Sequence, residues 1–266
     1  MKLLAAKQTL HRLLIVMLGL LGVAAMEVTT QTPVVQVVEC VRDNAPPHLI
    51  IDDLRIEARG EQVTTPQLSA RFYSRRDRDG LRAMLHITAP SDLAGMRYLL
   101  VEQSGDDALH LYLPALGKVR RVNSAGPDGQ IAGTTLDVSD LRLISQLLSA
   151  SSISRDRATR WHDRAAQVLR FSPTVADSPY RRVLATVDEQ TCVVVRAEFQ
   201  DAEDTVKTYQ VEPASLRQAG RYWYASRGRL HDHRLGSNID LSLGAVRVDR
   251  KPPSRSFDPS HFHKLD

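Results

Sequence analysis

The 266-residue sequence lacks the short motifs that mark the common enzyme classes. It contains no Gly-x-Ser-x-Gly elbow, no phosphate-binding loop, no dinucleotide fingerprint and no Cys-x-x-Cys pair. Two His-x-His pairs, His231 with His233 and His261 with His263, could each place two ligands on one strand face, but a metal site usually needs three or four. We therefore expect no catalysis, no metal and no other cofactor.

A long apolar run and a basic excess are also missing. The apolar run of residues 13–23 is about eleven residues long, against the ~20 residues that a membrane-spanning helix needs. It follows Lys2, Lys7 and Arg12 and precedes small residues, which is typical of a cleavable signal peptide over residues 1–25; an uncleaved anchor is the alternative. Without those three cations the formal net charge of +4 falls to about +1, which gives no reason to expect nucleic acid as a partner. We expect export to the periplasm, with residues 26–266 as a single domain.

Cysteine is scarce, with only Cys40 and Cys192 present. In an oxidising periplasm the two could form a disulfide that closes a loop of about 150 residues and contributes ~4–5 kcal/mol on the chain-entropy model. The alternative is two separately buried thiols, since free cysteine packs as a small apolar group. Nothing in the sequence decides between them.

Most of the chain beyond residue 48 alternates apolar and polar residues, which is typical of strands with one buried face. The pattern predicts roughly ten strands and two helices. Residues 96–101 are apolar at nearly every position and predict a strand covered on both faces, in the middle of the sheet. The polar stretch 149–160 is expected to be a loop, and the tail beyond residue 251 to be loosely held.

Two amphipathic helices are expected. Thr32 can cap the first and Pro33 can open it. The second begins near Asp137. Each could be a movable cover over an apolar groove or an ordinary helix packed on the core. The residues expected on their apolar faces are Val34, Val37, Val38 and Val41 in the first, and Leu141 and Ile144 in the second.

One stretch carries a family resemblance. The chain from Tyr112 to Val122 reads Tyr-Leu-Pro-Ala-Leu-Gly-Lys-Val-Arg-Arg-Val and resembles the YLPALKKVRR block of the LolA-like outer-membrane lipoprotein-sorting proteins. Asp79-Gly80, residues 90–95 and residues 133–137 lie where that family has further blocks, although residues 133–136 read Gly-Thr-Thr-Leu where the family has Gly-Ser-Asp-Phe. The resemblance implies a mainly β, α+β fold in which a single curved antiparallel sheet forms an incomplete barrel with helical lids.

The resemblance also implies that the concave face receives acyl chains. The same apolar residues would look identical in a plain packed core. Arg120 and Arg121 could contact a lipid head group or an acidic partner, with a solvated hairpin tip as the alternative. The residues expected on the concave face are Leu68, Phe72, Leu85, Ile87, Leu109, Leu111, Leu113, Val183, Val193, Val195, Phe199 and Leu241.

These expectations combine into a hypothesis about function. The protein would be a monomeric periplasmic carrier or chaperone that binds the acyl chains of lipoproteins or lipids, touches membrane surfaces transiently and helps sort its cargo to the outer membrane. The resemblance allows an inner-membrane RND-type transporter as a partner. The alternative is an envelope sensing or interaction module that binds a membrane partner, and an enzyme ranks third.

Overall fold

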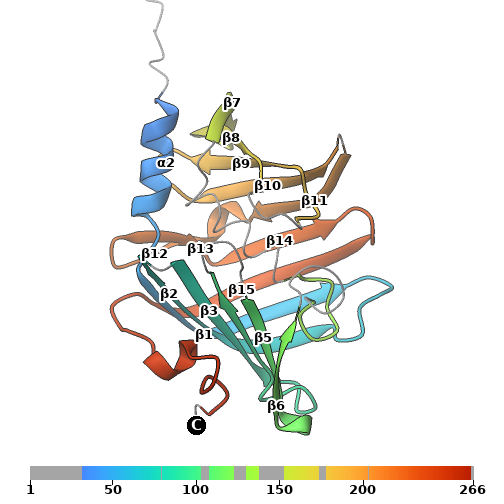
Figure 1. Ribbon diagram of the computed structural model, residues 1–266. Helices are drawn as coiled ribbons and strands as arrows, with labels where there is room; N and C mark the ends of the chain where they lie inside the picture. The colour runs from blue at the N-terminus through green and yellow to red at the C-terminus, as the bar shows by residue number, and fades with distance from the viewer. Residues whose placement is uncertain are drawn as a thin grey trace, which may run out of the picture. The chain divides into compact units, whose positions relative to one another are not determined.

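The computed structural model describes residues 32–78, 80–102, 108–122, 130–137, 153–173, 178–202 and 204–264. Thr32–Asp266 form one compact unit. The signal peptide expected over residues 1–25 lies outside the described residues. Within the described ranges the chain forms fifteen strands and one α-helix, α2 (Val34–Asp43), where roughly ten strands were expected (Figure 1).

Thirteen strands form one antiparallel sheet in the order β6-β5-β4-β3-β2-β1-β15-β14-β11-β10-β9-β8-β7. The order is open, with β6 at one edge and β7 at the other, and the pairing of β1 with β15 joins the two halves. The predicted curved antiparallel sheet, not closed into a barrel, is confirmed (Figure 1). The bounds are β1 His48–Arg59, β2 Gln67–Asp77, β3 Gly80–Ala89, β4 Arg97–Val101, β5 Ala108–Leu113, β6 Lys118–Val122, β7 Ile153–Trp161, β8 Arg164–Phe171, β9 Arg182–Asp188, β10 Val194–Asp201, β11 Asp204–Val211, β14 Arg227–Asp232 and β15 Ser237–Arg247, with a separate hairpin of β12 Leu216–Ala219 and β13 Tyr222–Ala225.

Alternation along the strands gathers the main core on one face of the sheet, which we call the inner face. Strand β4 departs from the alternation because all five of its residues are buried. Tyr98 and Leu100 join the main core, whereas Leu99 and Val101 pack on the opposite, outer face. The two-sided burial was predicted correctly, but its place in the middle of the sheet was not, because β4 is the third strand from the β6 edge.

The C-terminal segment covers the outer face of β3–β5. A 3₁₀ turn, Ser254–Phe257, places Phe257 against Met84 and Leu99, and Phe262 follows into the same cluster with none of its surface exposed. The buried Arg97 donates to the His263 carbonyl. The expectation of a loosely held tail is therefore wrong, because two aromatic rings anchor a stretch that otherwise looks polar.

The stretch 149–160 was expected to be a loop, but Ile153–Trp161 form the edge strand β7. Its pattern is hard to read because the register with β8 shifts between Arg155 and Arg157. Such a bulge interrupts the period-two alternation. An edge strand also carries charges that keep other chains from pairing with it. Both features remove the apolar alternation that predicts a strand.

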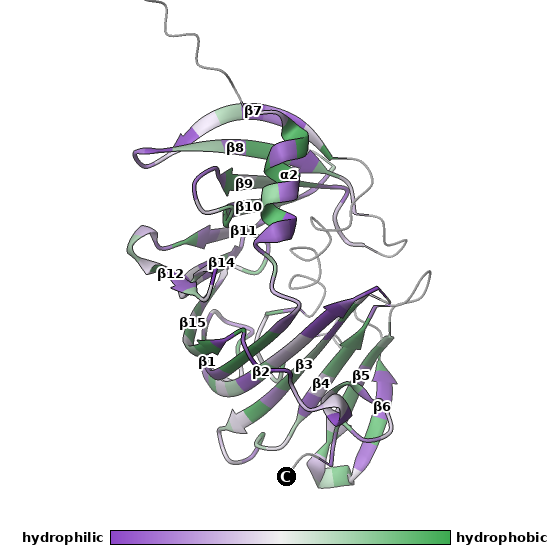
Figure 2. Cartoon of the chain, turned by 90° about the vertical axis from the view of Figure 1, so that its left-hand side faces the viewer, coloured by the Kyte–Doolittle hydropathy of each residue, from purple (hydrophilic) through white to green (hydrophobic). Residues whose placement is uncertain are grey.

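Helix α2 is packed on the core and held at several points. Val37, Val38 and Val41 are buried in the main cluster, and Val34 is partly buried against it. A disulfide joins Cys40 to Cys192, with Cα atoms 5.5 Å apart, so the pairing left open by the sequence is made. The N-cap is Pro33 rather than Thr32. The helix lies along one end of β8–β10 (Figures 1 and 2).

Among the residues that the structure describes, no helix is both long enough and apolar enough to cross a bilayer.

Candidate functional site

The inner face of β1–β6 is organised in cross-strand rows. Pairing of the strands places Ile51, Phe72, Leu85, Tyr98, Leu111 and Arg120 side by side in that order. Because directly paired residues of an antiparallel sheet share a face, the six side chains form one row from the centre of the sheet to its β6 edge. We call it the edge row. Its five apolar members end on a cation.

Ten of the twelve residues expected on the concave face lie on the inner face, and nine of them belong to its main cluster. The fully buried ones are less than 6% exposed, and the partly buried ones pack against the same cluster. Leu113 is half-buried outside the core clusters and pairs with Lys118. The buried six are Leu68, Leu85, Ile87, Leu109, Val183 and Phe199, and the partly buried three are Phe72, Leu111 and Leu241.

Val193 and Val195 do not join the inner-face cluster. They form a separate cluster with Val211, next to the β12–β13 hairpin. The reason is a register shift between Val194 and Arg196 in the pairing of β10 with β9, which makes the alternation slip by one residue. As a result Val194 packs against the main cluster in their place. Their expected position with the other ten was wrong.

Arg120 and Arg121 lie on opposite faces of the edge strand β6 and not at the hairpin tip, which is Gly117. Arg120 pairs with Leu111 on the inner face, and Lys118 lies on that face two residues earlier. Arg121 pairs with His110. Burial lowers the pKa of His110, and the positive charge of Arg121 lowers it further. Within the described ranges, no acidic partner of Arg120 is present. Two adjacent residues that looked equivalent in sequence therefore have different surroundings.

A segment of residues 130–137, which we call the strap, lies against the inner face. Ile131 and Leu136 are fully buried in the main cluster. The Ala132 amide donates to the Tyr98 hydroxyl over 2.9 Å, and Thr135 hydrogen-bonds Ser237 over 2.7 Å. The strap thus joins β4 in one half of the sheet to β15 where the halves meet.

The strap ends in a buried ion cluster that sequence reasoning missed. Lys207, only 4% exposed, lies 2.9 Å from Asp137 and 3.6 Å from Asp232, measured from its Nζ to the carboxylate oxygens. A buried ammonium is stable only when paired and hydrogen-bonded. No local signal marks this cluster, because its members come from three distant parts of the chain.

The two predicted lid helices have different outcomes. Val34, Val37, Val38 and Val41 lie in a helix attached to the β9–β10 turn by a disulfide, which is the arrangement of a core-packed helix. At its end, Asn44 exchanges two hydrogen bonds with the backbone of Trp223. Leu141 and Ile144 lie outside the described residues.

Burial raises the pKa of two tyrosines at the inner face. Desolvation raises the pKa of Tyr98, and it raises the pKa of Tyr209 to about 12. In the first His-x-His pair, both rings have ordinary hydrogen-bond partners: His231 hydrogen-bonds Asn238 and His233 hydrogen-bonds Thr208. In the part of the chain that is described, no group of three or more His, Cys, Asp or Glu side chains could hold a metal ion.

A protein-family model matches most of the chain. A family model described as "Uncharacterized protein" matches residues 80–264, well over half of the sequence. The chain belongs to this family. No curated protein matches the sequence.

Solved structures identify the fold as LolA-like. A LolA superfamily protein from Nitrosomonas europaea is 16% identical with a TM-score of 0.62, over 86% of this chain and 98% of that chain. A domain assigned as an outer membrane lipoprotein-sorting protein, from Vibrio parahaemolyticus, is 20% identical with a TM-score of 0.71, over 85% of this chain and 97% of that chain. A DUF1329 family protein from Desulfovibrio piger is 18% identical with a TM-score of 0.74, over 86% and 99%. At such identities the likeness establishes the fold alone.

Proposed function

We propose that this LolA-like protein is a periplasmic carrier that binds the acyl chains of lipoproteins or lipids on its inner face and helps deliver them to the outer membrane. An inner-membrane RND-type transporter is a candidate donor. The observation that carries the proposal is a continuous apolar face on a sheet that stays open at both edges. An open sheet can be entered from its edge, whereas a closed barrel surrounds its interior on all sides. The protein would act by binding and release, without catalysis.

The disulfide supports the exported location. Disulfides persist in oxidising compartments and are rare in the cytosol. The Cys40–Cys192 bond therefore agrees with the signal-peptide pattern of residues 1–25.

The edge row supplies the path for an acyl chain. From Phe72 to Arg120 it crosses five strands, a span of about 19 Å at ~4.8 Å per strand. That span matches an extended acyl chain of about fifteen carbons, and each methylene buried contributes ~0.8 kcal/mol. Leu111 is half-buried and next to the edge, so binding would begin there. Because Tyr98 is hydrogen-bonded to the strap, occupation of the whole row requires the strap to give way.

The cations at the end of the row suit the polar end of the cargo. An acyl chain that lies along the row would bring its head group to Arg120, with Lys118 on the same face. Guanidinium and ammonium groups attract phosphate and carboxylate. Arg121 provides a matched control because it lies one residue away on the other face.

The experiment is lipid extraction and native mass spectrometry of the purified mature protein, followed by titration with a fluorescent acyl probe. Leu111→Ser should weaken probe binding, and Val119→Ser, half-buried on the outer face of the neighbouring strand, should leave it unchanged. Arg120→Ala should weaken binding of an anionic acyl probe, and Arg121→Ala should not. A protein that is repeatedly empty and takes up no probe would refute the carrier proposal. A membrane partner that still copurifies with Leu111→Ser would instead favour the interaction module.

A further inference from the structure

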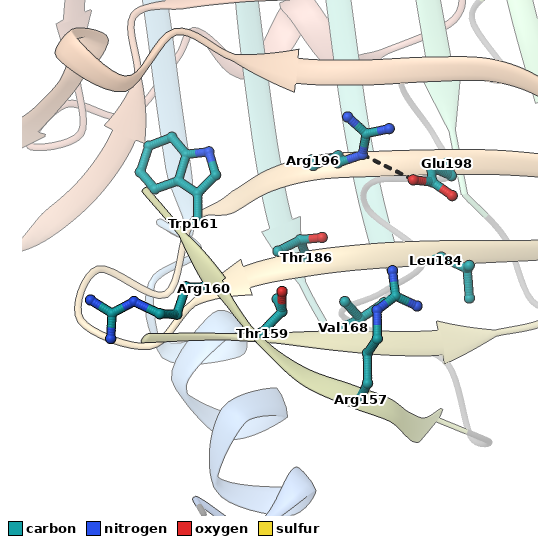
Figure 3. A pocket seen from close by; sticks show the side chains of 9 residues that line it. All are labelled: Arg157, Thr159, Arg160, Trp161, Val168, Leu184, Thr186, Arg196 and Glu198. Atoms are coloured by element: carbon teal, nitrogen blue, oxygen red, sulfur yellow. Dashed lines mark hydrogen bonds and ion pairs between the residues drawn. The ribbon is translucent and has the colours of Figure 1, made fainter. Parts of the chain in front are cut away.

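A polar pocket lies on the outer face of the sheet, over β7–β10 (Figure 3). Its volume is about 130 Å³. In β8 and β9, Leu169 and Ala185 point into the main core. Their sequence neighbours Val168 and Thr186 point to the opposite face and line the pocket. The pocket is therefore separated from the inner face by the thickness of the sheet.

Two arginines of the lining stand at opposite ends of one cross-strand row. Strand pairing places Arg157, Val168, Thr186 and Arg196 side by side in one cross-strand row. Three strand spacings put the backbones of the two arginines about 14 Å apart. Because Val168 and Thr186 are short and buried, both long side chains can lean over them from opposite sides. The row thus forms a floor with a guanidinium at each end.

A carboxylate orients each guanidinium and leaves other N–H groups available. Arg196 donates its Nε to Glu198 over 2.9 Å, and Arg157 donates one Nη to Asp156 over 2.6 Å. In the described part of the chain, the remaining N–H groups of these two arginines have no acceptor. The planar guanidinium of arginine presents a fork of donors, which fits the oxygens of phosphate better than a flexible ammonium does.

The charge and the walls of the pocket favour an anion. The lining carries three arginines, Arg157, Arg160 and Arg196, against Glu198 in the lining and Asp156 bonded to Arg157, which leaves one positive charge in excess. Arg160 extends away from the other lining side chains, while Trp161 forms one end of the pocket (Figure 3). The indole offers a flat surface for whatever substituent the anionic group carries.

We propose that this outer-face pocket binds a phosphate group, with Arg157 and Arg196 as its ligands. The volume suits one small anionic group rather than a whole lipid. The phosphate could belong to a soluble phosphorylated compound or to the head group of an anionic phospholipid at a membrane surface. The proposal does not depend on acyl-chain binding at the inner face.

The test is titration of the full mature protein with inorganic phosphate by calorimetry, and with vesicles of phosphatidylglycerol or of phosphatidylcholine by co-sedimentation. Arg157→Ala and Arg196→Ala should each weaken binding about tenfold or more. Arg196→Lys keeps the charge but removes the fork and should also weaken it. Arg229→Ala is the matched control, since Arg229 is an exposed arginine held by a carboxylate, Asp240, away from the pocket.

Binding of inorganic phosphate with this mutational pattern supports a soluble ligand. Preference for phosphatidylglycerol vesicles with the same pattern supports a head group. A wild-type protein that binds neither probe overturns the proposal, and so does unchanged affinity in Arg157→Ala and Arg196→Ala proteins that unfold at the wild-type temperature. Equal weakening by Arg229→Ala overturns it as well, because it would indicate a diffuse effect of net charge. Leu111→Ser should leave phosphate binding intact, which separates this site from the inner face.

Discussion

Removal of the Cys40–Cys192 disulfide should lower stability strongly. The two cysteines are 152 residues apart in sequence. A cross-link of that length removes chain entropy from the unfolded state that corresponds to about 5 kcal/mol at 25 °C. We expect the native contacts of α2 to remain in the reduced protein, because Val37, Val38 and Val41 are buried in the main cluster. We therefore expect a folded but much less stable protein.

The measurement is urea unfolding of the wild type and of the Cys40→Ala/Cys192→Ala double variant at pH 7. We expect the free energy of unfolding to fall by about 5 kcal/mol, and the melting temperature by about 10–20 °C for a chain of this size. Wild-type protein reduced with dithiothreitol should behave like the double variant, which controls for the alanine side chains. Amide exchange in Val34–Asp43 should accelerate more than in the central strands, because the bond fixes that helix directly.

A difference of less than about 1 kcal/mol between the oxidised and reduced proteins would refute this reasoning, since a bond of this span acts mainly on the unfolded chain. Unfolding of the reduced protein in the absence of denaturant would contradict the second part, namely that α2 is held by packing as well as by the bond.

Three further predictions concern single residues. Gly133→Ala should lower the free energy of unfolding in urea by about 3 kcal/mol, because φ is +75° and a Cβ would collide with the β1–β2 loop. Gly117→Ala, with φ +58° and open space, should lower it by only about 1 kcal/mol in the same assay. Phe262→Ala should cost about 3 kcal/mol or more by urea unfolding, since the ring is fully buried; a change below 1 kcal/mol would mean that the tail contributes little. Hydrogen bonding by Arg229 is the largest cause that lowers the pKa of Asp240, so this carboxylate stabilises the fold above its unfolded pKa, near 4, and stops doing so as the pH falls through the lower folded value. Asp240→Asn should therefore reduce the loss of melting temperature below about pH 4, and an unaltered pH profile would argue against the ion pair.

The strand pattern was readable where a strand has one buried face and a regular partner. Leu68, Leu85 and Leu109 were placed on the inner face by alternation alone, and the structure agrees. The errors fall where the register shifts. A bulge in β10 moved Val193 and Val195 out of the expected cluster, and a bulge in β7 hid a whole edge strand. A bulge depends on how two strands pair, so one strand's sequence cannot reveal it.

The candidate sites were less predictable than the fold. Adjacent Arg120 and Arg121 could not be told apart until the register of β6 put one on each face. The phosphate pocket needs four strands in register, and the ion cluster of Lys207 needs three distant segments. Arg157 and Arg196 carry no motif that would have drawn attention to them.

The amino-acid sequence alone determined that most of this chain forms strands with one apolar face, because period-two alternation is a local property of the backbone. It also contained the block from Tyr112 to Val122 that points to the LolA-like fold. Only the tertiary structure decided which thirteen strands join, that Cys40 reaches Cys192, that the tail covers the outer face, and which cations share a face with the apolar rows. These are relations between distant segments, and their free energy comes from contacts that exist only once the chain has folded.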